Sequence, residues 1–312
     1  MIWRPAWLST SIHKYVGIRS SLHPPPSPYF PVRLSRRAPI TRCIDNLGAS
    51  AYLWIEVLGV VLTLLPGAAL SAGTEVLSES GISVTFEQTG DASQIGEFKK
   101  NILPEVKNIL SDLTRDLGDM PSNSNVKIFF YSPETYHAKF PRTIATRIPA
   151  FYSREGIQAR ADNDVDYSLK TTLRHELTHL IVDTHYGRVP AWMNEGLAVY
   201  EERLISVDPA PHNIDYNTLV IAKQDGKYLS LETLDSQSYF GRDHGTVASG
   251  LAYTIAYVAV YELKQKSGMD TIRSYLKSVG AGKNPRAQFE SAFGMSYAAF
   301  NDFLLKTSGE KS

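Results

Sequence analysis

The stretch Arg174-His175-Glu176-Leu177-Thr178-His179-Leu180 has the form H-E-x-x-H and decides how the rest of the chain is interpreted. On an α-helix, residues four positions apart share one face, so the imidazoles of His175 and His179 can reach one metal ion. Glu176 is rotated from His175 by about 100° around the helix axis, which places it beside the metal rather than on it. A carboxylate there can act as general base toward a metal-activated water. The motif alone also fits a helix with two surface histidines.

The flanking residues favour a helix that is half buried. Leucines recur at helical spacing and point away from the two histidines, so one side can enter a core while the other stays accessible. Asp166 is a candidate N-cap for this helix. The leucines of this stripe are Leu169, Leu173, Leu177 and Leu180.

A second motif follows after a short connection. Residues 189–200 read as a helix with Pro190 near its first turn, and they contain Trp192-Met193-Asn194-Glu195-Gly196-Leu197-Ala198. The pair H-E-x-x-H and W-x-N-E-G-L-A resembles the gluzincin zinc metallopeptidases, in particular the peptidase-MA-like families of bacteria. The resemblance implies that His175, His179 and Glu195 bind Zn²⁺ and that Glu176 is the catalytic base. Two imidazoles and one carboxylate leave a fourth zinc position open, as catalytic zinc sites require.

The third ligand has two competitors in the sequence. His185 has the spacing of the metzincin pattern H-E-x-x-H-x-x-G-x-x-H, but Val182 stands where that pattern has glycine. A β-branched residue disfavours the positive φ of that turn, so His185 is expected in the loop before Gly187. Asp183 lies one helical turn beyond His179, which would move it about 6 Å along the helix axis and away from the ion. Glu195 arrives on a separate helix and meets neither difficulty.

The resemblance also implies a Tyr or His donor opposite the metal, which would stabilise the oxyanion. Tyr253 resembles the tyrosine that begins the corresponding helix in peptidase-MA-like proteins, and His244 is a rival donor. Tyr257 and Tyr261 follow on neighbouring turns of the same helix. All three tyrosines could instead be buried aromatic residues.

The N-terminal region has the composition of a targeting segment. Residues 1–49 are rich in Pro, Ser and Arg and show no hydrophobic period, which indicates a disordered extension or a mis-assigned start codon. Residues 50–72 contain the apolar run 57–65 followed by small residues, as in a secretory signal peptide. An uncleaved membrane anchor and a buried core helix are the alternatives. The protein is expected to be exported, to the periplasm or the extracellular space.

The charge distribution sets the remaining domain apart from this region. Residues 1–72 carry seven Lys or Arg and two acids, while the chain as a whole has 32 of each sign, so residues 73–312 have a net charge of −5. This mildly acidic domain predicts no nucleic-acid partner. The chain's single cysteine, Cys43, precedes the apolar run, so the exported part would form no disulfide.

Hydrophobic spacing predicts the other elements. We expect strands at 82–86, 126–131 and 156–161, a helix at 95–117 with a kink at Pro104, a mostly irregular segment at 205–249, and helices at 251–266, 271–279, 285–293 and 297–304. Together with the resemblance, this predicts an α+β zincin-like fold with a small N-terminal mixed sheet, the metal-binding helix and a C-terminal helical subdomain. The domain is expected to occupy residues 73–312.

The expected function is hydrolysis of a peptide bond in a peptide or protein substrate. In the families that the chain resembles, the strand before the metal helix is a sheet edge that pairs with extended substrate, which points to residues 157–161. An ordinary edge strand, with Arg160 there to prevent aggregation, would look the same. The competing class is a non-catalytic binding or structural protein that keeps a zincin fold.

Overall fold

A computed structural model describes residues 74–79, 81–87, 92–119, 125–142, 149–161, 167–205, 209–240 and 245–312. They all lie in one compact unit, Ser71–Ser312. The expected extension, the signal or anchor segment at 50–72, Asp166 and His244 lie outside the described residues. A search of the described helices finds none that is both long and apolar enough to span a membrane.

A five-stranded mixed sheet forms the N-terminal part of this unit. Its strands are β1 (Thr74–Glu79), β2 (Ile82–Glu87), β3 (Val126–Tyr131), β4 (Ala150–Ser153) and β5 (Gly156–Arg160), in the spatial order β1-β2-β3-β5-β4. The central pairs β2–β3 and β3–β5 are parallel, and the edge strands β1 and β4 are antiparallel to their neighbours. The mixed sheet was expected from the sequence, but β1 and β4 were not.

The predicted edge strand is wrong. Residues 157–160 belong to β5, which lies between β3 and β4, so Arg160 protects no edge. The edge is β4, which a tight turn at Arg154 and Glu155 connects to β5. A strand of four residues is too short to show a period, and for this reason the sequence did not reveal it.

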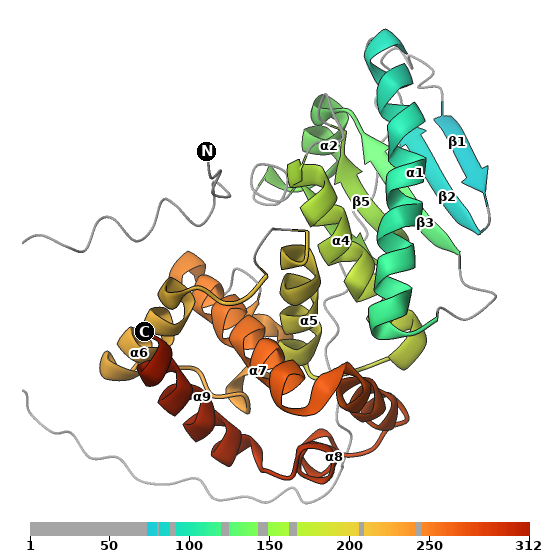
Figure 1. The fold of residues 1–312 in the computed structure, drawn as a ribbon. Coiled ribbons are helices and arrows are strands. Elements are labelled where there is room, and N and C mark those ends of the chain that lie inside the picture. Colours follow the sequence, from blue (N-terminus) through green and yellow to red (C-terminus); the bar gives the residue numbers. More distant parts are fainter. Residues whose placement is uncertain are drawn as a thin grey trace, which may run out of the picture. The chain divides into compact units, whose positions relative to one another are not determined.

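One face of the sheet is covered by α1 (Ala92–Leu117) and α4 (Tyr167–Ile181), which lie side by side in Figure 1. Phe98 of α1 meets the rings of Phe86 and Phe130 at centroid distances of 6.1 and 5.1 Å. These rings lie on the face of each strand that alternation directs into the core. On the other face, α2 (Pro133–Lys139) packs through Tyr136 on Tyr131. The helix predicted at 95–117 is present as α1, which continues through Pro104 as one element.

The rest of the described chain, after β5, is mostly helical. The segment predicted to be mostly irregular, 205–249, contains α6, because Tyr216, Leu219 and Ala222 recur at helical spacing and are buried. The break predicted near Gly268 is present, since Gly268 has φ 78° within the long helix α7. The elements are α5 (Ala191–Arg203), α6 (Asn213–Gln224), α7 (Gly245–Gly280), α8 (Pro285–Phe293) and α9 (Tyr297–Lys311).

Helix α5 lies between α4 and α7, at the middle of the unit (Figure 1). Gly196 permits a close approach to α7, since a Cβ atom there would lie 2.4 Å from the backbone oxygen of Ala256. The residue before it, Glu195, is therefore carried on a helix whose position is fixed by backbone contact. The α+β fold expected from the sequence is the fold observed.

Candidate metal centre

Helix α4 presents His175 and His179 on the face opposite the leucine stripe, where their side chains are 16% and 12% exposed. The opposite face buries the leucine stripe, and this burial fixes the orientation of the helix. The centroids of the two imidazole rings are 4.8 Å apart. The helix does not leave its axis at Val182, because residues 182–186 continue as a π-helical turn that ends at Gly187, with φ 77°. The chain then reaches α5 within a few residues.

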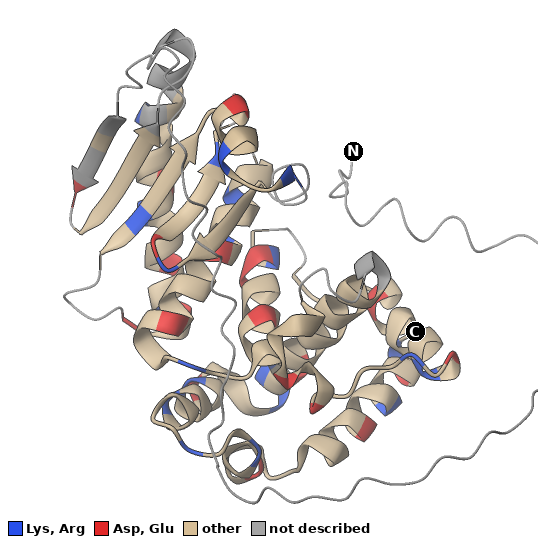
Figure 2. Cartoon of the chain, turned by 180° about the vertical axis from the view of Figure 1, so that it is seen from behind, with Lys and Arg blue, Asp and Glu red and all other residues tan. Residues whose placement is uncertain are grey.

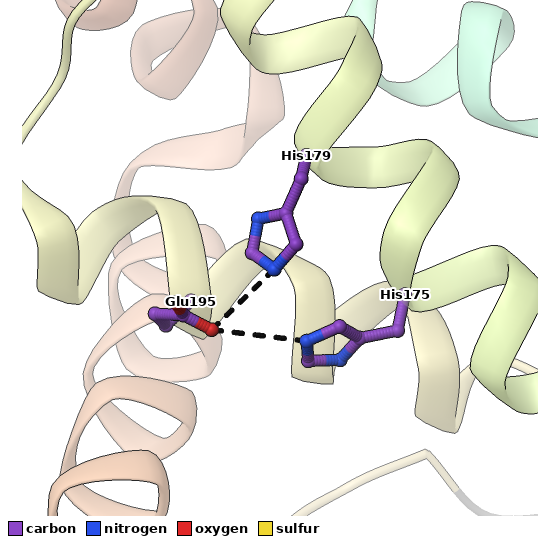
Figure 3. Close-up of side chains that lie close together, drawn as sticks. All are labelled: His175, His179 and Glu195. Carbon is purple, nitrogen blue, oxygen red and sulfur yellow. Dashed lines mark ion pairs between the residues drawn. The ribbon is translucent and has the colours of Figure 1, made fainter. Parts of the chain in front are cut away.

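Helix α5 brings Glu195 to the two histidines. Glu195 is 4% exposed, and its Oε2 lies 3.7 Å from Nε2 of His175 and 3.4 Å from Nε2 of His179 (Figure 3). One ligand atom from each residue lies within 4.8 Å of the other two. Within the described residues, no other group of three His, Cys, Asp or Glu side chains is arranged to hold a metal ion.

Two observations indicate that these residues fit a metal ion. Oε2 of Glu195 is buried and accepts no hydrogen bond, which is costly for a carboxylate unless a cation binds there. Both rings also have their far nitrogen engaged, since Nδ1 lies 3.1 Å from Oε2 of Glu202 in His175 and 3.0 Å from Oδ1 of Asn194 in His179. Such partners fix ring orientation and tautomer in metal sites, which leaves each Nε2 free to coordinate.

The electrostatics of the centre are dominated by carboxylates, and Figure 2 shows the acidic residues of α5 in red. Burial lowers the pKa of His175, but the carboxylates of Glu195 and Glu202 outweigh it and raise this pKa well above 6.5. The pKa of His179 is also raised, because Glu195 outweighs burial. Burial raises the pKa of Glu195, but His179 and His175 outweigh it and lower the pKa below its usual value. The site therefore attracts cations.

Glu176 lies between the histidines and the edge strand. Its Oε2 accepts a hydrogen bond of 2.7 Å from the backbone N–H of Tyr152 in β4. Burial raises the pKa of Glu176, while His175, His179 and this N–H oppose the rise. A carboxylate with a raised pKa beside a metal position is suited to take up a proton.

Tyr253 of α7 reaches the same site. Its ring centroid lies 6.5 Å from that of His175, and its hydroxyl donates to the backbone oxygen of Phe240 at 3.1 Å. Burial and the carboxylates of Glu195 and Glu176 raise the pKa of Tyr253 above its usual value, so the hydroxyl stays protonated and able to donate. Tyr257, one turn further on, is fully buried.

The two rival ligands lie elsewhere. His185 is exposed and packs against Tyr186, with a centroid distance of 4.5 Å, near Gly118 rather than near the histidine pair. Asp183 is exposed and accepts a hydrogen bond of 3.0 Å from the hydroxyl of Tyr152.

Three residues of the centre were missed by sequence reasoning. Asn194 was quoted only as part of the W-M-N-E motif. Glu202 lies seven residues after Glu195, two helical turns on, and this spacing was a signal that could have found it. Gln237 donates from Nε2 to Oε1 of Glu195 at 2.6 Å, and nothing in its local sequence indicates this.

Comparison with known proteins agrees with this geometry. The family model of the Peptidase MA superfamily matches residues 150–307, from β4 to α9. A search of curated proteins gives no match. The matched region covers half of the chain and includes every residue of the centre described above. The chain therefore belongs to the Peptidase MA superfamily, a family of peptidase-like hydrolases that are typically metal-dependent.

Proposed function

We propose that this protein is a zinc metallopeptidase of the gluzincin type, with His175, His179 and Glu195 as ligands and Glu176 as general base. The observation that supports it most is the convergence of two Nε2 atoms on a buried carboxylate oxygen that has no hydrogen-bond partner. Two nitrogen ligands and one oxygen ligand suit Zn²⁺ and leave a coordination position for water or substrate. When bound, zinc would act as a Lewis acid toward the scissile carbonyl and the attacking water.

Glu176 carries the proton in this proposal. It accepts a proton as the water oxygen bonds to the carbonyl carbon, and it passes this proton to the amide nitrogen as the C–N bond breaks. The products are a carboxylic acid and an amine. The N–H of Tyr152 holds the carboxylate in place through this exchange.

Edge strand β4 is the proposed binding surface for an extended peptide. On its inner side, β4 pairs with β5, and there the N–H of Arg160 donates to the oxygen of Pro149. The N–H of Tyr152 instead donates to Glu176. The outer edge of β4 therefore runs past the general base. Antiparallel or parallel pairing uses every second backbone amide of a peptide. N-methylation of a substrate should therefore slow cleavage at alternate positions, and uniform sensitivity along the peptide would remove β4 from the binding site.

Tyr253 is the proposed oxyanion donor. Its hydroxyl would exchange the backbone oxygen of Phe240 for the developing oxyanion of the substrate. Export to the periplasm or the extracellular space, through residues 50–72 as signal peptide or as membrane anchor, is part of the same proposal.

The decisive experiment compares Glu176→Gln with Glu155→Gln, a matched change in the exposed turn between β4 and β5. Zinc content and cleavage of an unstructured protein are measured with and without a chelator. We expect Glu176→Gln to keep zinc and lose cleavage, and Glu155→Gln to keep both. Full activity in Glu176→Gln would make the mechanism wrong. A wild-type protein that binds zinc without cleaving would instead be a non-catalytic binding protein.

The ligand assignment is tested by removing one side chain at a time. Glu195→Ala should lose bound zinc, because it removes the carboxylate that, among the described residues, forms the metal group with both Nε2 atoms. His185→Ala should keep zinc, since His185 lies against Tyr186. The opposite pattern would overturn the gluzincin assignment.

A further inference from the structure

We propose that Gln237 is a positioning residue of the metal centre, whose amide restricts Glu195 to coordination through one oxygen. This inference rests on the metal site of the proposed function, but it concerns a residue outside both sequence motifs. Gln237 lies in the connection between α6 and α7, 42 positions after Glu195.

The contact divides the roles of the two carboxylate oxygens. Oε1 of Glu195 accepts from Nε2 of Gln237 at 2.6 Å, while Oε2 faces the two histidines and accepts no hydrogen bond. A carboxylate can bind a metal through one oxygen or two. Because Oε1 is engaged, a metal ion would take Oε2 alone. The coordination position that Oε1 could otherwise fill would then remain available for water or a substrate carbonyl.

Gln237 is exposed, yet the segment that carries it is fixed. Leu234 and Phe240, on either side of it, are buried, with exposed fractions of 0% and 5%. Leu231, at the start of the segment, is also fully buried, and its N–H donates to Oδ1 of Asn301 at 3.2 Å. The amide therefore reaches Glu195 from a segment that is packed into the core, which reduces the entropic cost of holding this hydrogen bond.

The same segment also contacts Tyr253. The hydroxyl of Tyr253 donates to the backbone oxygen of Phe240, and the two rings meet at a centroid distance of 5.2 Å. Residues 231–240 thus touch the proposed third ligand through Gln237 and the proposed oxyanion donor through Phe240. One short piece of chain therefore contacts both groups.

The test replaces Gln237 with Met, which keeps the length of the side chain and removes the donor. Gln237→Asn is a second variant, which keeps the amide but shortens its reach. The matched control is Gln224→Met, at the exposed end of α6. Zinc affinity is measured by chelator competition, coordination number by the visible spectrum of the Co²⁺-substituted protein, and stability by Tm with and without metal.

We expect both Gln237 variants to bind zinc about 10- to 100-fold more weakly, the range found when a partner of a metal ligand is removed. The Co²⁺ spectrum should weaken as Oε1 joins the coordination sphere, and kcat should fall more than KM rises. The Tm of the metal-free protein should match that of Gln224→Met. Unchanged zinc affinity and Co²⁺ spectrum would overturn the proposal, as would an equal loss of Tm with and without metal.

These measurements distinguish a failure of the role proposed for Gln237 from a failure of the proposed peptidase function. Metal affinity and the Co²⁺ spectrum require no turnover, so a protein that binds zinc without cleaving peptides would still decide the role of Gln237. A wild-type protein that binds neither Zn²⁺ nor Co²⁺ would overturn both.

Discussion

At the scale of single residues, one feature distinguishes this centre from two histidines on a helix surface. In each ring, the nitrogen that faces away from the metal position has a side-chain partner. Oε2 of Glu202 lies 3.1 Å from Nδ1 of His175, and the pair is mostly buried. A carboxylate in this position fixes the tautomer and raises the basicity of the ring. We therefore expect the strength of metal binding to depend also on residues that would not touch the metal.

Replacing Glu202 tests this dependence. Glu202→Ala should weaken zinc binding by about 10- to 100-fold, because His175 loses the group that orients it. Glu202→Gln should lose less, since its amide oxygen still accepts a hydrogen bond. The control is Glu310→Ala, in the exposed last turn of α9. Equal zinc affinity in all three variants, measured by chelator competition, would contradict the prediction.

The neighbouring residue, Glu201, predicts a pH dependence of stability. Glu201 is fully buried, and it accepts a hydrogen bond of 2.9 Å from Nη2 of Arg174. Burial raises its pKa from the usual 4.5 to about 7, although Arg174 opposes the rise. Between these two values the folded protein holds a proton that the unfolded chain has released. The contribution of Glu201 to stability is therefore largest below pH 4.5 and is lost as the pH rises through about 7.

Glu201→Gln removes this titration. The free energy of unfolding of the wild type, relative to that of Glu201→Gln, should fall as the pH rises from 4.5 to about 7. Denaturant unfolding at several pH values measures the difference. A difference that is constant over this range, or that grows with pH, would show that Arg174 keeps the carboxylate ionised.

At the scale of elements, the contact between α5 and α7 determines where Glu195 lies. A Cβ atom on Gly196 would meet the oxygen of Ala256 at 2.4 Å and Cγ2 of Val260 at 2.7 Å. Gly196→Ala should therefore lower the free energy of unfolding by about 1–3 kcal/mol, the usual cost of overpacking. Zinc affinity should fall with it, because α5 must shift.

The matched control is Gly309→Ala in α9, where a Cβ atom would meet nothing within 4 Å. Alanine favours a helix over glycine by up to about 1 kcal/mol, so this variant should be neutral or slightly more stable. Denaturant unfolding of both variants checks the pair. Equal stability in the two would mean that the helices can separate at no cost.

The elements also show what the sequence could predict. Helix α4 and its leucine stripe follow from a local period, and α5 follows from Pro190 and the motif after it. Strand β4 has only four residues and no period, and its place at the edge depends on pairing with β5. Gln237 reaches Glu195 from a segment in which Leu234 and Phe240 are packed into the core. Contacts of this kind are set by tertiary structure, which single-sequence patterns do not contain.

At the scale of the whole molecule, the centre joins the two parts of the unit. Helix α4 packs on the sheet, while α5 packs on α7 of the helical part. A metal ion bound by His175, His179 and Glu195 would link α4 to α5. The stability of the folded chain should therefore depend on metal concentration.

Chelation should lower Tm, and added Zn²⁺ should restore it. A ligand that binds only the folded state stabilises it by about 4 kcal/mol when its free concentration is 1,000-fold above Kd. The Tm of Glu195→Ala should not respond to the chelator, because its ligand set is incomplete. A wild-type Tm that is insensitive to both additions would exclude a metal ion that links the helices.

The short distance along the chain between the ligands also has a consequence for the order of folding. His179 and Glu195 are 16 positions apart, whereas pairing Ile82 of β2 with Val126 of β3 closes a segment of 44 positions. Closing the longer segment costs about 1 kcal/mol more in chain entropy, and parallel strand pairing is slow. We expect the hairpin of α4 and α5 to form first and to bind zinc before the sheet is complete. Refolding in stopped-flow experiments should then be faster with zinc than with a chelator, and equal rates would mean that the metal binds only after folding.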